Sequence, residues 1–107
     1  MSMKYITPHQ LNHRLNQNDN IFVIDIRESY ELEICKLKST HIPMETIPER
    51  INQLNRLTET IIICRTGKRA EAVANLLIKE YNFEDVKVLD GGIMKWIEEI
   101  DSTLERY

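Results

Sequence analysis

Two short runs of mainly β-branched residues constrain the fold of this chain more than any other feature. They are Ile21-Phe22-Val23-Ile24 and Thr60-Ile61-Ile62-Ile63. Both are far too short to span a bilayer, and both place apolar residues on the two sides of an extended strand. Such strands are typical of a parallel sheet that is buried on both faces. Two further short strands are predicted, at Tyr5-Ile6 and Val86-Lys87-Val88-Leu89. Thr40-His41-Ile42-Pro43 is predicted to be a short extended segment that Pro43 stops.

Amphipathic segments separate the strands. Thr7 can cap a helix that begins at Pro8, and Gln10 completes a capping box. The polar stretch 27–33 predicts one or two helical turns. Apolar residues at helical spacing predict three more helices, marked by Ile47, Ile51 and Leu54 (with Pro48 in the first turn), by Ala70, Val73, Ala74, Leu77 and Tyr81, and by Ile93, Trp96, Ile97 and Ile100. This alternation predicts an α/β fold with helices on both faces of a parallel sheet.

The size and charge of the chain indicate one domain with a local function. With 107 residues there is room for a single domain over 1–107. The net charge is −3, from 17 acidic and 14 basic residues, which gives no support to nucleic acid or membrane surfaces as partners. Residues 1–5 lack the long apolar run of a signal peptide, so we expect a cytoplasmic protein.

The two cysteines indicate neither a disulfide nor a metal site. Cys35 and Cys64 form no C-x-x-C pair, and a structural disulfide is the less favoured use of cysteines in a reducing compartment. His9, His13 and His41 do not fall at zinc-ligand spacing around either cysteine. We therefore expect no metal and no cofactor.

Cys64 stands where the second buried strand turns into a helix, and ligands of open α/β sheets bind at the carboxyl ends of strands. The N–H groups of residues 65–69 are not yet paired within the helix, so they can point at an anion, and the helix dipole adds positive potential. Gly67 would let the loop curl around one point. Three cations follow within five residues of the sulfur: Arg65, Lys68 and Arg69. These effects favour the nucleophilic thiolate. The alternative, a small apolar filler at a strand end, would not need this cationic loop.

Four motifs in order resemble the rhodanese family over nearly the whole chain. They are a D-x-R-x-x-x-E pattern (Asp25 to Glu31), the His41-Ile42-Pro43 segment, a C-x-x-G-x-R loop (Cys64 to Arg69) and a Gly-Gly-x-x-x-W element (Gly91 to Trp96). The resemblance implies a three-layer α/β domain with a central, mostly parallel five-stranded sheet. Cysteine phosphatases on this fold use C-x5-R, whereas the six-residue loop here resembles the sulfurtransferase version.

The resemblance implies a sulfurtransferase. The Cys64 thiolate would take a sulfane sulfur from thiosulfate or another persulfide and carry it as a persulfide, held by the N–H groups of 65–69. A thiol, cyanide or a protein thiocarboxylate would accept it. The substrate-binding residues would be Arg65, Thr66, Gly67, Lys68 and Arg69. The alternatives are a non-catalytic module that binds a partner or delivers sulfur within a complex, and, less favoured, a phosphatase or arsenate reductase.

The sequence leaves the roles of four charged residues near the site open. Asp25 and Arg27 are expected to support the site through an ion pair or hydrogen bonds. Arg69 could orient the donor or brace the loop through backbone carbonyls, and Glu31 is interpreted as helix solvation or a partner of Arg27.

The stretch around Cys35 departs from the family, which has Gly-His where this chain has Cys35-Lys36 and Gly-Ala where it has Ser39-Thr40. Cys35 could be a resolving thiol or could simply occupy the glycine position. This stretch is most similar to rhodanese domains that follow ubiquitin-activating-like enzymes, which allows a protein as sulfur acceptor. His41 is given no base role, and Trp96 is expected in the core.

Overall fold

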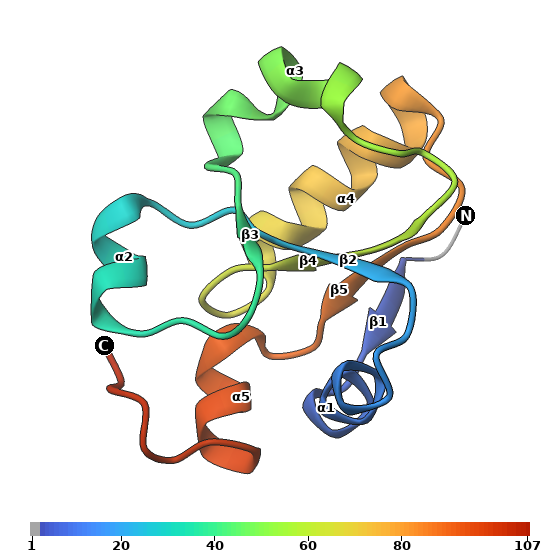
Figure 1. Cartoon of the computed structure of the whole chain (residues 1–107). Helices are drawn as coiled ribbons and strands as arrows, with labels where there is room; N and C mark the ends of the chain where they lie inside the picture. The colour runs from blue at the N-terminus through green and yellow to red at the C-terminus, as the bar shows by residue number, and fades with distance from the viewer. Residues whose placement is uncertain (1–2) are drawn as a thin grey trace.

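A parallel sheet of five strands forms the centre of the computed structural model, which describes residues 3–107 (Figure 1). The strand order is β1-β5-β4-β2-β3, and every neighbouring pair is parallel. The strands are β1 (Lys4–Ile6), β2 (Ile21–Asp25), β3 (Thr40–His41), β4 (Glu59–Ile63) and β5 (Val86–Leu89). The central β4 lies between β2 and β5, which fits the apolar residues Ile61, Ile62 and Ile63. The predicted α/β class is confirmed.

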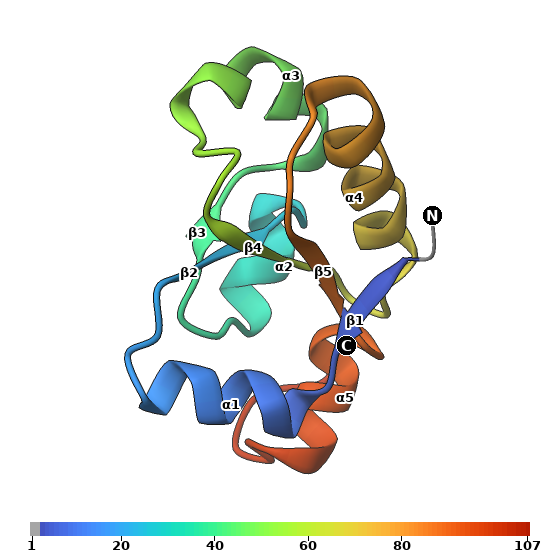
Figure 2. The same ribbon diagram turned by 90° about the vertical axis from the view of Figure 1, so that its right-hand side faces the viewer.

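Helices cover the two faces of the sheet (Figures 1 and 2). On one face lie α1 (Pro8–Asn16) and α5 (Gly92–Glu99), and on the other lie α3 (Ile47–Arg50) and α4 (Lys68–Tyr81). The short α2 (Ser29–Ile34) lies beyond the carboxyl end of β2. Side chains alternate between the faces, so that Ile62 packs with the α4 side while Ile61 and Ile63 pack with the α1 and α5 side. Both faces of β4 are therefore buried.

The predicted start of α1 is confirmed in detail. The amide of Gln10 donates to Thr7 Oγ1 at 3.1 Å, and the amide of Thr7 donates to Gln10 Oε1 at 2.9 Å. Within residues 3–107, no helix combines the length and apolar character that crossing a bilayer requires.

The helix predicted around Ile47, Ile51 and Leu54 is shorter than expected. The structure has only the four residues of α3, preceded by a 3-10 turn at Met44–Thr46 and followed by another at Ile51–Gln53. No side chain caps α3, and its continuation tightens until the amide of Leu54 bonds to the carbonyl of Ile51. Short segments without caps end in this way.

The first turn of α5 fastens the loop that follows β4, residues 64–69, which we call the Cys64 loop. The amide of Ile93 donates to the carbonyl of Cys64 at 2.9 Å, and the amide of Met94 donates to the carbonyl of Arg65 at 3.1 Å. The backbone of Gly92 (φ +63°) lies so close to the loop that a Cβ there would overlap the carbonyl of Arg65. The Gly-Gly element is thus what lets α5 hold this loop.

Gly92→Ala should destabilise the protein more than Gly91→Ala. Both glycines have positive φ, which costs an alanine about 1–2 kcal/mol. A Cβ at Gly91 would meet only the flexible side chain of Lys95, whereas one at Gly92 would meet the backbone of Arg65. Chemical denaturation of the two variants measures the difference. Equal losses would contradict the close approach of α5 to the loop.

Candidate active site

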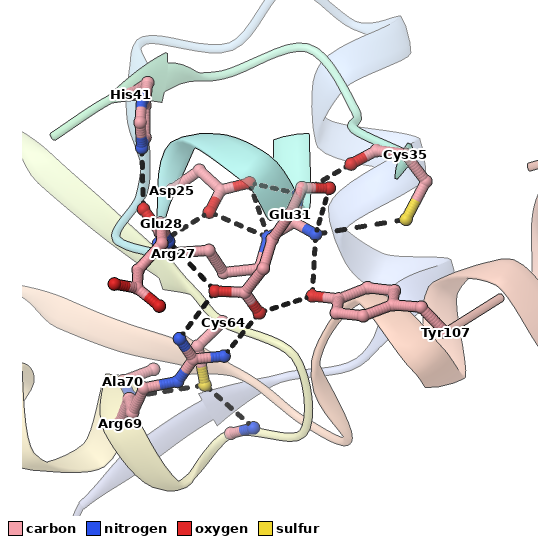
Figure 3. A network of polar contacts seen from close by, with 11 residues as sticks. Asp25, Arg27, Glu28, Glu31, Cys35, His41, Cys64, Arg69, Ala70 and Tyr107 are labelled. Atoms are coloured by element: carbon pink, nitrogen blue, oxygen red, sulfur yellow. Dashed lines mark hydrogen bonds and ion pairs between the residues drawn. The ribbon is translucent and has the colours of Figure 1, made fainter. Parts of the chain in front are cut away.

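Cys64 is buried directly after β4, and its sulfur accepts hydrogen bonds from two backbone amides (Figure 3). The amide nitrogen of Gly67 lies 3.0 Å from Sγ and that of Ala70 lies 3.4 Å from it. The predicted range of amides, 65–69, includes Gly67 but stops one residue short of Ala70. The sulfur is thus held by the start of the helix as well as by the loop.

The sulfur takes the place of a capping side chain at α4. Gly67 is the N-cap of this helix and offers no side-chain acceptor, and its left-handed backbone (φ 112°) suits glycine. A Cβ at Gly67 would meet only ordinary contacts, so conformation rather than space requires glycine. Amides at a helix start need an acceptor, and together with the dipole they favour an anion. In this structure the acceptor is Cys64 Sγ, which receives the amides of Gly67 and Ala70.

The other residues of the Cys64 loop differ in their exposure to solvent. Arg65, Thr66 and Lys68 are exposed, whereas Gly67 is buried. The outer side of the loop therefore carries two cations that an anionic ligand could meet. Their contact with a donor stays a prediction.

Arg69 forms a two-pronged ion pair with Glu31 of α2. Its two terminal nitrogens lie 2.8 Å from the two carboxylate oxygens. The hydrogen bond to Glu31 raises the pKa of Arg69, and Cys64 contributes a weaker attraction. The interpretation of Glu31 as helix solvation is wrong, because only 2% of this residue is exposed. Its ion-pair partner is Arg69, whereas Arg27 reaches only its backbone carbonyl.

Asp25 and Arg27 form a fully buried ion pair at the end of β2, as predicted. Arg27 Nη2 lies 2.8 Å from Asp25 Oδ2, and both side chains have no exposed surface. The same nitrogen donates to the carbonyl of Cys35 at 2.8 Å, and the amide of Arg27 donates to Asp25 Oδ1 at 3.0 Å. The pair therefore fixes the turn after β2 and the end of α2, on which Glu31 stands.

Tyr107 completes this network and was not predicted from the sequence. Its hydroxyl donates to Glu31 Oε1 at 2.7 Å and accepts from Arg27 Nη1 at 2.9 Å. Burial raises the pKa of Tyr107 to about 12; the hydrogen bond with Arg27 lowers this pKa in part, and the hydrogen bond to Glu31 raises it. A single tyrosine 76 positions from its partner carries no sequence signal that would place it here.

His41, Trp96 and Cys35, which the sequence also singled out, make structural contacts. His41 Nε2 lies 2.6 Å from the carbonyl of Arg27, which can only accept, so this nitrogen must donate a proton. Trp96 is buried in the core as predicted. Cys35 and Cys64 are free and buried in two different core clusters, which gives no support to a resolving role for Cys35.

Comparison with known proteins finds matches that cover most of the chain. The family described as Rhodanese-like domain matches residues 7–99. The Bacillus subtilis protein named "Putative sulfurtransferase YtwF" is 33% identical over 97 residues, covering 90% of this chain and 92% of that protein. A Rhodanese-like domain protein from Staphylococcus aureus has a TM-score of 0.81 at 30% identity, covering 98% of this chain and 99% of that one.

A longer relative also matches. "Adenylyltransferase and sulfurtransferase UBA4" of Debaryomyces hansenii is 32% identical over 101 residues, which cover 86% of this chain. The match spans only 22% of that protein.

Asp25→Asn should destabilise the protein strongly. The change keeps the side-chain shape but leaves Arg27 buried without a counter-charge, which costs about 3–5 kcal/mol. Asp19→Asn is the control, because Asp19 pairs with Arg14 at the surface and such pairs contribute about 0–1 kcal/mol. Chemical denaturation compares the two. A loss no larger than that of Asp19→Asn would show that the buried pair does not stabilise this end of β2.

The stabilising effect of Glu31 should disappear at acid pH. The Arg69 hydrogen bond lowers the pKa of Glu31 from 4.5 to about 2. The folded state is therefore favoured by the ionised carboxylate above 4.5, and this advantage is lost as the pH falls toward 2. The free energies of unfolding of wild type and Glu31→Gln should converge over that range, while Glu33→Gln, an exposed position on α2, stays close to wild type throughout. A gap between wild type and Glu31→Gln that does not narrow would contradict the ion pair.

Proposed function

The chain belongs to the Rhodanese-like domain family, and from this premise we propose that it is a sulfurtransferase that carries a sulfane sulfur as a persulfide on Cys64. The observation that carries the proposal is the seating of Cys64 Sγ against the amides of Gly67 and Ala70. A site that presents amide donors to a sulfur anion can hold the negative charge of a persulfide in the same way. The names of the Bacillus subtilis and Debaryomyces hansenii relatives, which both contain the word sulfurtransferase, support this chemistry.

The reaction divides into two displacements at sulfur. In the first, the Cys64 thiolate attacks the outer sulfur of thiosulfate and forms a new S–S bond. The old S–S bond breaks, and sulfite leaves with its electron pair. In the second, an acceptor such as cyanide attacks the outer sulfur of the persulfide. Thiocyanate forms, and the Cys64 thiolate is restored without any net oxidation of the enzyme.

The side chains of the loop suit an anionic donor. Arg65 and Lys68 are exposed beside the buried sulfur, and their charges would attract thiosulfate or another anionic persulfide. Arg69 is already paired with Glu31, so we assign it mainly to holding α4 against α2 and only secondarily to the donor. In a cell, a thiol or a protein thiocarboxylate would take the place of cyanide.

Incubation with thiosulfate followed by intact-mass measurement tests the proposal. Wild type should gain the mass of one sulfur atom and lose it when cyanide is added. Cys64→Ser should gain none, whereas Cys35→Ala should behave as wild type, because Cys35 lies in the other core cluster.

Two results would contradict the proposal. Wild type that takes up no sulfur from thiosulfate or from any other sulfane donor would favour a non-catalytic binding module. Turnover of phosphate esters or arsenate by the same preparation, without sulfur uptake, would favour the phosphatase alternative.

A further inference from the structure

The segment after α5 returns along the molecule and brings Tyr107 to the Cys64 loop (Figures 1 and 3). Its hydroxyl lies between Arg27 and Glu31, at 2.9 and 2.7 Å. Two guanidinium groups lie over its ring: the guanidinium carbon of Arg65 is 4.6 Å from the ring centroid, and that of Arg27 is 5.8 Å from it. One half-buried side chain thus joins α2, the end of β2 and the loop that holds the sulfur.

Through these contacts Tyr107 reaches two loop arginines. It touches Arg65 directly through its ring, and it touches Arg69 through Glu31, whose two oxygens hold both terminal nitrogens of Arg69. Arg65 directly follows Cys64 in the chain, and its side chain is exposed. The ring is the contact that holds this otherwise exposed side chain.

We propose that Tyr107 is a positioning residue that holds Arg65 at the mouth of the site to receive an anionic sulfur donor, an inference that rests on the proposed sulfurtransferase function. The hydroxyl fixes the ring by bonding to Arg27 and Glu31, and the ring face then holds the guanidinium by a cation–π contact. An arginine fixed in advance attracts an anion without the loss of side-chain freedom that a mobile arginine would suffer on binding.

The geometry gives Tyr107 more than a packing role. A tyrosine that only filled space would need one partner for its hydroxyl, and here the hydroxyl both accepts from Arg27 and donates to Glu31. The two hydrogen bonds of the hydroxyl therefore fix the orientation of the ring, and one face of the ring contacts the guanidinium of Arg65.

The alkylation of Cys64 by two reagents of different charge tests this inference without relying on sulfur transfer. In a Cys35→Ala background Cys64 is the only cysteine. Iodoacetate is an anion and iodoacetamide is neutral, so the ratio of their rates reports the positive charge felt at the sulfur. Changes in general accessibility alter both rates together and cancel in the ratio.

Tyr107→Leu should lower the iodoacetate-to-iodoacetamide ratio by about two- to five-fold, the range expected for loss of an exposed cation–π contact. Tyr107→Phe keeps the ring but loses the hydroxyl bonds that fix it, so its ratio should fall less than that of Tyr107→Leu. Tyr81→Leu and Tyr81→Phe are the matched controls, because Tyr81 is also partly buried but lies at the far end of α4. Neither control should change the ratio.

Three results would overturn the inference. They are an unchanged ratio in Tyr107→Leu, an equal fall in Tyr81→Leu, and a fall in Tyr107→Phe as large as in Tyr107→Leu. The last would assign the effect to the hydroxyl rather than to the ring that holds Arg65.

Kinetics with thiosulfate separate this inference from the proposed function. If wild type transfers sulfur, Tyr107→Leu should raise KM by about the same two- to five-fold factor and leave kcat nearly unchanged. A lower kcat at unchanged KM would contradict a role in donor capture. If wild type transfers no sulfur, the proposed function fails, and the alkylation ratio still decides the position of Arg65.

Discussion

The site depends on one interaction: the sulfur of Cys64 serves as the acceptor for the unpaired amides at the start of α4. A helix start needs such an acceptor, and here the need is met by the sulfur of Cys64 instead of a capping side chain. The sheet delivers Cys64 at the end of its most buried strand, and the first turn of α5 holds the carbonyls of Cys64 and Arg65. Cys64, the start of α4 and the loop therefore stabilise one another.

The charges around this interaction are arranged in two layers. The inner layer, Asp25 with Arg27, is fully buried and fixes the backbone after β2. The outer layer, Glu31 with Arg69, joins α2 to the first turn of α4. Tyr107 bonds to both layers. Because Arg27 and Arg69 each have their own carboxylate, Arg65 and Lys68 are the exposed cations of the Cys64 loop.

Local rules predicted much of the fold and the centre of the site. The apolar runs predicted the central strands, the capping box predicted the start of α1, and the position of Cys64 after β4 predicted amide contacts to its sulfur. What failed depends on contacts distant in sequence. Glu31 pairs with Arg69 across 38 positions, and Tyr107 reaches Glu31 across 76. No periodicity reports such pairs, although the D-x-R-x-x-x-E pattern already contained Glu31.

The central claim is that the amides of Gly67 and Ala70 hold the sulfur that the protein carries. Amide NMR spectra of the isotope-labelled protein before and after loading with one sulfane sulfur test it directly. We expect the resonances of Gly67 and Ala70 to shift most on loading and to return when cyanide removes the sulfur. Loading that shifts neither resonance, or shifts them no more than amides at the far end of α4, would contradict the account.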